Sequence, residues 1–184
     1  NKRGAVEMLT LLIEAGANVN TEALKHPYMR HSFSVTALML SADRSPIDTM
    51  RVLIDKGSNI NWSNENGHTA LSTCVYNLMH TSTTGSSYGR TLQNSKEKIR
   101  MLIEAGANVN MRDKNGETVL MLIVKSACNH GRKHVFETIQ MLIDAGADVN
   151  IRDNNGNTAL MLLYNRLYRD EMDYRPVSLP HLKV

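Results

Sequence analysis

Apolar residues recur at the spacing of one helix face in four separate segments of the chain. Each segment carries three large aliphatic positions, with a turn of helix between the first and the other two, and is followed by a glycine. Because glycine readily takes a positive φ, it is well suited to end a helix. The pattern therefore predicts four helices, starting at Gly4, Ser45, Asn94 and His134. Their apolar sets are Leu9, Leu12, Ile13; Met50, Leu53, Ile54; Ile99, Leu102, Ile103; and Ile139, Leu142, Ile143, and their closing glycines are Gly16, Gly57, Gly106 and Gly146.

The starts of these helices carry further signals. Ser45 and Asn94 are residue types that cap helices, and Pro46 suits a first helical position. An acid follows three residues after each expected start, at Glu7, Asp48, Glu97 and Glu137, where it would face the positive end of the helix. Ile103 is expected to lie in the interior, and Arg51 on a solvated outer face.

A second pattern follows each of the first, and it predicts a turn and another helix. Residues 64–71, 113–120 and 153–160 read NENGHTAL, DKNGETVL and DNNGNTAL, and a degenerate copy ends at Leu38. The glycines of these blocks suit the tips of hairpins. The threonines occupy the position that would cap the following helix: Thr36, Thr69, Thr118 and Thr158.

The two patterns form one internal repeat. Their shortest spacings add up to 33 residues, and the longer spacings place three insertions near residues 21–35, 78–93 and 127–133. The first insertion is expected to extend a hairpin. The second, His80 to Gln93, is rich in Ser, Thr and Gly without an apolar period, and we expect it to be flexible.

These blocks resemble the ankyrin repeat family, whose repeats carry G-A-D-V-N and D-x-x-G-x-T-P-L-H patterns. The resemblance covers roughly residues 4–169, but methionine or serine stands where the family has its histidine: Met39, Ser72, Met121 and Met161. The resemblance implies an all-α, elongated solenoid of helix pairs with β-hairpin turns. Residues 1–169 would form three full pairs and two terminal half repeats. Residues 170–184, with Pro176 and Pro180, are expected to form an extended tail.

Composition and charge exclude several classes of protein. Hydrophobic residues make up 42% of the chain, which suffices for a core, but the longest apolar run is far too short to span a membrane. The net charge of +3 is too balanced to indicate nucleic-acid binding. Two cysteines cannot form a disulfide framework, so we expect an intracellular, cytoplasmic protein, or one in a host cytoplasm if it comes from a virus or pathogen. The first residue is Asn, and we read the sequence as part of a longer protein.

Few residues of the sequence suggest a catalytic, metal-binding or nucleic-acid-binding site. No clustered glycines form a phosphate loop, and no nucleophile with its base has a local signature. Cys128, His130 and His134 have the residue types of a zinc site, but Arg132 and Lys133 stand between them, and a solvated loop is the favoured interpretation. Residues 25–31 are basic with one aromatic, which is too little for a nucleic-acid surface. We expect no enzyme activity, no metal and no cofactor.

The resemblance implies instead a protein-binding surface, formed by the hairpin tips and the exposed, concave face of the first helix of each pair. The predicted contact residues are Trp62, His68, Tyr76, Lys114, Lys125, Arg152, Asn155 and Arg166. Their basic character predicts a protein partner with an acidic patch, and we expect a monomer. The alternative role is substrate recognition within a larger adaptor, a ubiquitin-ligase receptor or a viral or pathogen effector.

Two alternatives concern single positions. Trp62, the one tryptophan, either anchors a partner or packs against a neighbouring hairpin. The asparagine that closes each first block is expected to bond its own turn. In similar proteins this asparagine can be hydroxylated, and Asn150 fits that alternative best. The four asparagines are Asn20, Asn61, Asn110 and Asn150.

Overall fold

The computed structural model describes residues 2–23, 34–43, 45–80, 88–127 and 133–173. These residues form an all-α solenoid, as the sequence predicts, with one short two-stranded sheet. The helices in chain order are α1 (Lys2–Glu14), α2 (Ala37–Asp43), α3 (Ile47–Asp55), α4 (Ala70–His80), α5 (Tyr88–Glu104), α6 (Val119–Ala127), α7 (Lys133–Asp144) and α8 (Ala159–Asp173).

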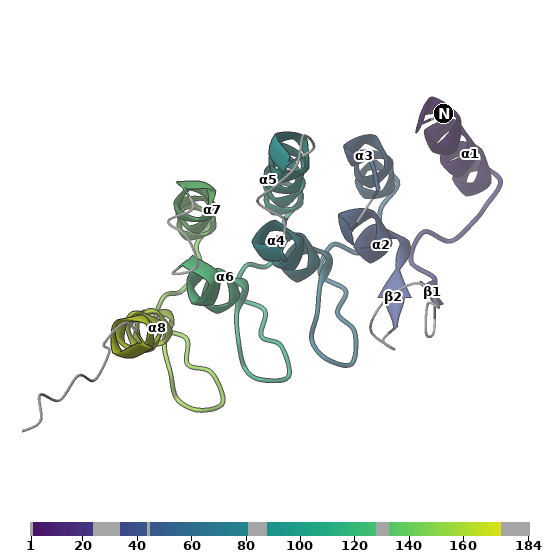
Figure 1. The fold of residues 1–184 in the computed structure, drawn as a ribbon. Helices are drawn as coiled ribbons and strands as arrows, with labels where there is room; N and C mark the ends of the chain where they lie inside the picture. The colour runs from purple at the N-terminus through teal and green to yellow at the C-terminus, as the bar shows by residue number, and fades with distance from the viewer. Residues whose placement is uncertain (1, 24–33, 44, 81–87, 128–132, 174–184) are drawn as a thin grey trace, which may run out of the picture.

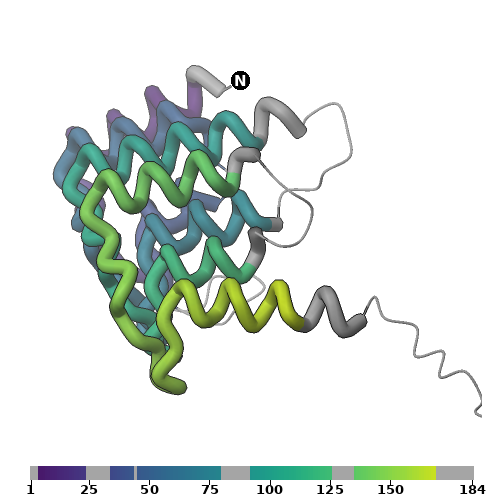
Figure 2. Tube along the Cα trace, turned by 90° about the vertical axis from the view of Figure 1, so that its left-hand side faces the viewer, coloured from purple at the N-terminus to yellow at the C-terminus, as the bar shows by residue number. Residues whose placement is uncertain are grey.

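The helices lie in two layers along the stack. Figure 1 shows α1, α3, α5 and α7 in one layer and α2, α4, α6 and α8 in the other, with the hairpins projecting beyond the second layer. Turned by 90°, the same stack shows the helices of each layer superimposed and running nearly parallel (Figure 2). Helices α2 to α7 therefore pack in pairs, α2 with α3, α4 with α5 and α6 with α7, while α1 packs against α3 and α8 against α6 along the stack.

Threonine begins every helix of the second layer, as predicted. The Thr69 hydroxyl accepts a hydrogen bond from the Ser72 amide at 3.1 Å, and Thr36, Thr118 and Thr158 make the equivalent contact at 3.4 Å. These hydroxyls satisfy amides at the helix start that have no partner within the helix.

A glycine with positive φ follows each helix of the first layer, α1, α3, α5 and α7. Gly57 has φ of 85°, and its amide donates to the Ile54 carbonyl at 3.0 Å while the Ser58 amide donates to the Leu53 carbonyl at 3.0 Å. This pair of bonds is the Schellman motif, which the left-handed glycine makes possible.

The core is aliphatic and rich in methionine. Fully buried leucines occupy one position in three helices of the first layer, Leu53, Leu102 and Leu142. Six methionines lie at repeat positions that predict core packing; Met39, Met50 and Met121 are buried and Met101 and Met141 partly buried, but Met161 is 44% exposed. Ile103, expected in the interior, packs against the core but is only half-buried.

Several helix boundaries differ from those predicted. α5 begins at Tyr88, so residues 88–93, expected to be flexible, are helical, and α4 extends to His80. No proline and only one glycine interrupt residues 88–104, so the helix continues one and a half turns ahead of Asn94. Residues 81–87 lie outside the described part.

The caps predicted for the helices of the first layer, Ser45 and Asn94, are wrong. The residue that precedes α3 is Pro46, without a side-chain cap, and Ser45 lies outside the helix. Asn94 lies inside α5. Of the four acids expected at helix starts, only Asp48 lies in a first turn.

The two remaining insertions and the tail are described in part. β1 (Glu22–Ala23) pairs antiparallel with β2 (Val35–Thr36), which forms the base of the expected extended hairpin; residues 24–33 are not described. Helix α8 runs to Asp173, four residues into the predicted tail, because no helix-breaking residue precedes Pro176. Residues 128–132 and 174–184 lie outside the described ranges.

Candidate partner-binding surface

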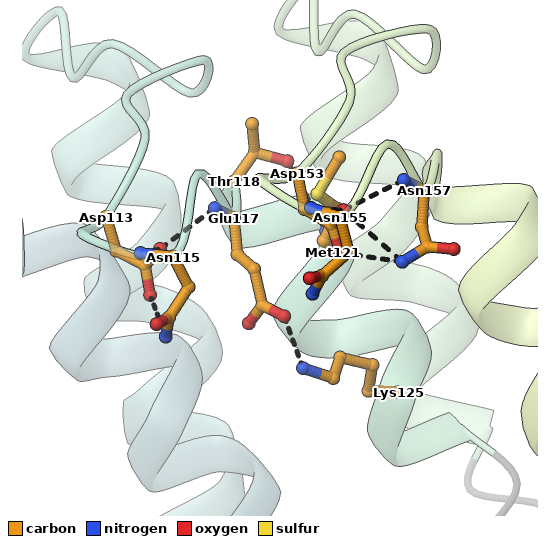
Figure 3. A network of polar contacts seen from close by, with 9 residues as sticks. All are labelled: Asp113, Asn115, Glu117, Thr118, Met121, Lys125, Asp153, Asn155 and Asn157. Carbon is orange, nitrogen blue, oxygen red and sulfur yellow. Dashed lines mark hydrogen bonds and ion pairs between the residues drawn. The ribbon is translucent and has the colours of Figure 1, made fainter.

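The tip of each of the three fully described hairpins is a turn fixed by one side chain. Asp113 Oδ1 accepts hydrogen bonds from the amides of Asn115 and Glu117, both at 2.8 Å, and Asp153 Oδ1 accepts the same pair from Asn155 and Asn157 (Figure 3). Asn64 plays this part in the preceding hairpin, at 3.0 Å. These acids are therefore part of the scaffold, and they hold the tips in one conformation.

The electrostatics of Asp153 agree with this role. Burial raises the pKa of Asp153, but the hydrogen bonds from Asn157 and Asn155 and the positive charge of Lys125 lower it, and the net pKa lies below its ordinary value. The carboxylate is thus held in its charged form by the turn that it organises.

Successive hairpins are bonded to one another through their backbones. The Lys114 amide donates to the Asn66 carbonyl at 2.9 Å, and the Asn154 amide donates to the Asn115 carbonyl at 2.9 Å. The approach is so close that a Cβ on Gly67 would lie 2.6 Å from Asp113 Cα. The hairpins therefore form a continuous strip that presents its side chains from a stiff backbone.

Two arginine side chains on this strip form hydrogen bonds to backbone carbonyls and not to carboxylates. The Arg112 guanidinium donates to the carbonyls of Gly116, at 3.1 Å, and Arg152, at 3.0 Å. Arg152 donates to the Gly156 carbonyl at 2.9 Å. Both positive charges rest on neutral oxygens, so within the described hairpins they remain available to an acidic group.

A ladder of asparagines joins the repeats beside the strip. Asn61 Nδ2 donates to the Gly106 carbonyl at 3.1 Å, and Asn61 Oδ1 accepts from the Asn108 amide at 2.7 Å. Asn20 and Asn110 make the same two bonds to the repeat that follows each of them. The expectation that these asparagines bond their own turns is therefore wrong: their side chains join neighbouring repeats, and we call this set the asparagine ladder.

The side chain of Trp62 is partly packed against the core and partly exposed to solvent. Its side chain is half-buried against the core, and its Nε1 donates to Glu22 Oε1 at 2.9 Å across to β1. The structure thus supports the packing alternative for this position, because the indole already has a partner on the neighbouring hairpin. His68 is half-buried in the same hairpin, and its amide donates to Asn64.

The remaining predicted residues divide between the tips and the second helix layer. Lys114, Arg152 and Asn155 are exposed on the tips. On the helices, Tyr76 is exposed on α4, Lys125 is exposed on α6, and Arg166 is half-buried on α8. The Lys125 ammonium pairs with the Glu117 carboxylate (Figure 3), so its charge is largely compensated inside the molecule.

A buried lysine that the sequence analysis missed connects two repeats. Lys98 of α5 is 5% exposed, and its ammonium donates to the Ser41 carbonyl at 2.7 Å and to the Ala42 carbonyl at 3.5 Å, at the end of α2. Burial lowers the pKa of Lys98, while the nearby Cys74 and Asp43 act in the opposite direction. The lysine supplies donors to carbonyls that a seven-residue helix leaves unpaired.

Other kinds of site find no support among the described residues. They contain no group of three His, Cys, Asp or Glu side chains that could hold a metal ion, and none of their helices is suited to crossing a membrane. Of the candidate zinc ligands, Cys128 and His130 lie outside the described residues, as do residues 25–31.

Comparison with known proteins agrees with this geometry. The family model described as ankyrin repeats, in three copies, matches residues 1–83 and 90–167. No curated protein matches the chain.

Proposed function

Because the chain belongs to the ankyrin repeat family, whose members are generally non-catalytic protein–protein interaction modules, we propose that it binds another protein through its hairpin tips and the concave face of α4, α6 and α8. The mechanism is recognition by shape: a stiff stack presents side chains from several repeats at once. The observation that carries the proposal is the bonded strip of hairpins, whose backbone groups are used internally while its long polar side chains are exposed.

The charge of the strip favours an acidic patch on the partner. The guanidinium groups of Arg112 and Arg152 donate hydrogen bonds to neutral backbone carbonyls. The carboxylates of Asp113 and Asp153 accept hydrogen bonds from backbone amides of the tips. The formal charges of these two tips balance, but the cationic residues Arg112, Lys114 and Arg152 are exposed, whereas the acidic ones are half-buried or buried. A partner with complementary charge would associate faster and bind in one register.

The predicted contacts do not contribute equally. Lys114, Arg152 and Asn155 at the tips and Tyr76 on α4 are exposed and form the centre of the proposed surface. Lys125 is paired with Glu117, and Trp62 is bonded to Glu22, so both act mainly by supporting their neighbours.

The test begins with affinity capture of a partner from a eukaryotic cell extract, followed by calorimetry with purified components. We expect Arg152→Ala and Tyr76→Ala each to weaken binding by about 1–2 kcal/mol, as truncation of an interface anchor does. Affinity should also fall as salt is raised, because exposed charges are screened. Arg51→Ala is the matched control, since Arg51 is an exposed arginine on α3 in the other layer.

The opposite pattern would overturn the proposal. A partner that is lost on Arg51→Ala and retained by both other variants binds the outer layer instead. Circular dichroism of all three variants must match the wild type, and the exposure of the three side chains makes that the expected result.

A further inference from the structure

A groove lies between α5 and α7 in the first helix layer, whereas the hairpins project beyond the second layer (Figure 1). Both of its walls are described helices, and its volume is about 270 Å³. Its lining consists of Arg100, Ile103, Glu104, Met141, Asp144 and Ala145. Sites for drug-sized ligands enclose about 300–1,000 Å³, so this smaller groove suits one long side chain.

The apolar residues of the lining lie deeper than the acidic ones. Ile103, Met141 and Ala145 are half-buried and pack against the core, while Glu104 and Asp144 are exposed. A side chain that enters the groove would therefore contact apolar surface along its length and meet carboxylates at the rim.

Negative charge gathers at the rim because both helices end there. Glu104 is the last residue of α5, and Asp144 is the last residue of α7. The C-terminal end of a helix carries partial negative charge on its carbonyls, which favours a cation beside it. Among the described residues neither carboxylate forms an ion pair, and Asp144 accepts one hydrogen bond from Gln140 at 2.8 Å.

The positive charges near the groove are already engaged. Arg100 donates to Glu97 Oε2 at 2.6 Å, one turn earlier on α5. Lys96 of α5 pairs with Glu137 of α7, eight residues before Glu104, which is about 12 Å along the helix. This pair joins the two helices near their starts and leaves the carboxylates at their ends without a cation.

The preceding junction, between α3 and α5, repeats these residue types. The residues in the equivalent positions are Arg51, Ile54 and Asp55 on α3 and Met101, Glu104 and Ala105 on α5. Asp55 is again exposed and is the last residue of its helix. Packed helices lie about 8–10 Å apart, so Asp55, Glu104 and Asp144 follow one another at about that spacing along the stack.

We propose that this groove binds a basic segment of a partner protein, with one lysine side chain seated between α5 and α7. The aliphatic stem of that lysine lies on Ile103 and Met141, and its ammonium lies between the carboxylates of Glu104 and Asp144. Charge complementarity selects a cation, and the apolar lining selects a long stem. An extended chain rises about 3.3 Å per residue, so a second lysine three residues away reaches Asp55.

This inference goes beyond the proposed function and does not depend on it. The hairpin tips expose Arg112, Lys114 and Arg152 and favour an acidic partner, whereas the groove in the other layer favours a basic one. Loss of either interaction would leave the other in place.

The test uses a short glycine–serine peptide with lysine at every third position, labelled with fluorescein, and measures its binding by fluorescence anisotropy at low ionic strength. We expect Glu104→Gln and Asp144→Asn each to weaken binding by about 3- to 5-fold, as the loss of one exposed ion pair does. Asp48→Asn is the matched control, because Asp48 is an exposed acid in the first turn of α3. It should leave the affinity unchanged.

A second peptide tests the apolar lining. Its lysines are replaced by 2,4-diaminobutyrate, which keeps the charge but shortens each stem by two methylene groups. We expect this peptide to bind about 5-fold more weakly or worse, because less apolar surface is buried. In methyl NMR spectra of the protein, the lysine peptide should shift the signals of Ile103 and Met141.

Four results would overturn the proposal. Equal affinity for the two peptides would show attraction by charge alone, and an equal loss in Asp48→Asn and Glu104→Gln would show that no particular acid is recognised. Unchanged methyl signals of Ile103 and Met141 would place the peptide elsewhere. Sedimentation velocity without peptide supplies the fourth: self-association that Glu104→Gln abolishes would mean that a second copy fills the groove.

Discussion

Asn61 and Asn110 each use both ends of one amide to join two repeats. The sequence shows the asparagine in every repeat, but it does not show its partner, because a side chain at a turn can bond its own backbone as easily as a neighbour's. Trp62 illustrates the same limit. Its bond to Glu22 depends on how β1 extends the first hairpin, and the sequence indicates only that an insertion exists there.

The ladder makes a prediction about stability. Asn110→Ala removes two hydrogen bonds and leaves the Gly146 carbonyl and the Asp148 amide without their partner, so unfolding free energy should fall by about 1–3 kcal/mol. Urea denaturation at low protein concentration measures this change. Asn150→Ala is the matched control, and equal losses in the two variants would show that the inter-repeat bonds contribute nothing.

The buried thiol of Cys74 makes a prediction about pH. Burial raises the pKa of Cys74 to about 12, while the nearby Lys98 lowers it. Above pH 9 the unfolded chain releases this proton and the folded chain keeps it, so stability falls as pH rises toward 12. The slope from this one group is about 1.4 kcal/mol per pH unit.

Cys74→Ala isolates that effect, because every other titrating group is shared with the wild type. The stability difference between wild type and variant, measured by denaturation at successive pH values above 9, should shift against the wild type. A difference that stays constant with pH would mean that the thiol has the same pKa in the folded and the unfolded chain, and would contradict the effect of burial.

Among whole elements, the periodic features were predictable and the helix ends were not. Threonine caps, closing glycines and buried leucines recur because every repeat meets the same neighbours. The start of α5 does not recur, since it depends on an insertion present in one repeat only. Serine- and threonine-rich composition suggested flexibility there, but the absence of a strong helix breaker after Gly89 was the better guide.

Helices of the same layer differ in how deeply they bury the equivalent residue, according to their place in the stack. Leu102→Ala in α5 should lower unfolding free energy by about 2–5 kcal/mol, as large-to-small changes in a packed core do. Leu12→Ala, at the same place in α1, should cost less than about 1 kcal/mol, because that side chain is largely exposed. Chemical denaturation of both variants decides, and a large loss at Leu12 would mean that α1 is covered in solution.

At the scale of the whole molecule, stability should follow position in the stack. Helices α4 and α6 have neighbours on both sides, whereas α1 and α8 have them on one. Hydrogen exchange of the dilute protein should therefore be slowest in α4 and α6 and fastest in α1 and α8. Mass spectrometry of proteolytic fragments measures this order, and protection of α8 equal to that of α4 would contradict it.

The predicted binding surface shows what can be inferred about the whole molecule from repeats alone. Repeat position correctly assigned Lys114, Arg152 and Asn155 to exposed tips, because the tips are defined by the same turn in each repeat. It did not show that Lys125 would pair with Glu117, because that contact joins a tip to a helix. Repeat position therefore locates the tips but does not reveal which of the charges are paired inside the molecule.

The asparagine ladder also bears on how such a molecule changes over generations. Each repeat carries one amide for the unit after it and one glycine carbonyl for the unit before it, so a duplicated or deleted repeat leaves every remaining junction complete. The three insertions lie in the first hairpin and in two connections between paired helices, and none of them falls between a closing glycine and its ladder asparagine. Gene rearrangement can thus change the number of repeats, and longer loops can change the surface of a repeat. The hydrogen bonds that join neighbouring repeats stay the same in both cases.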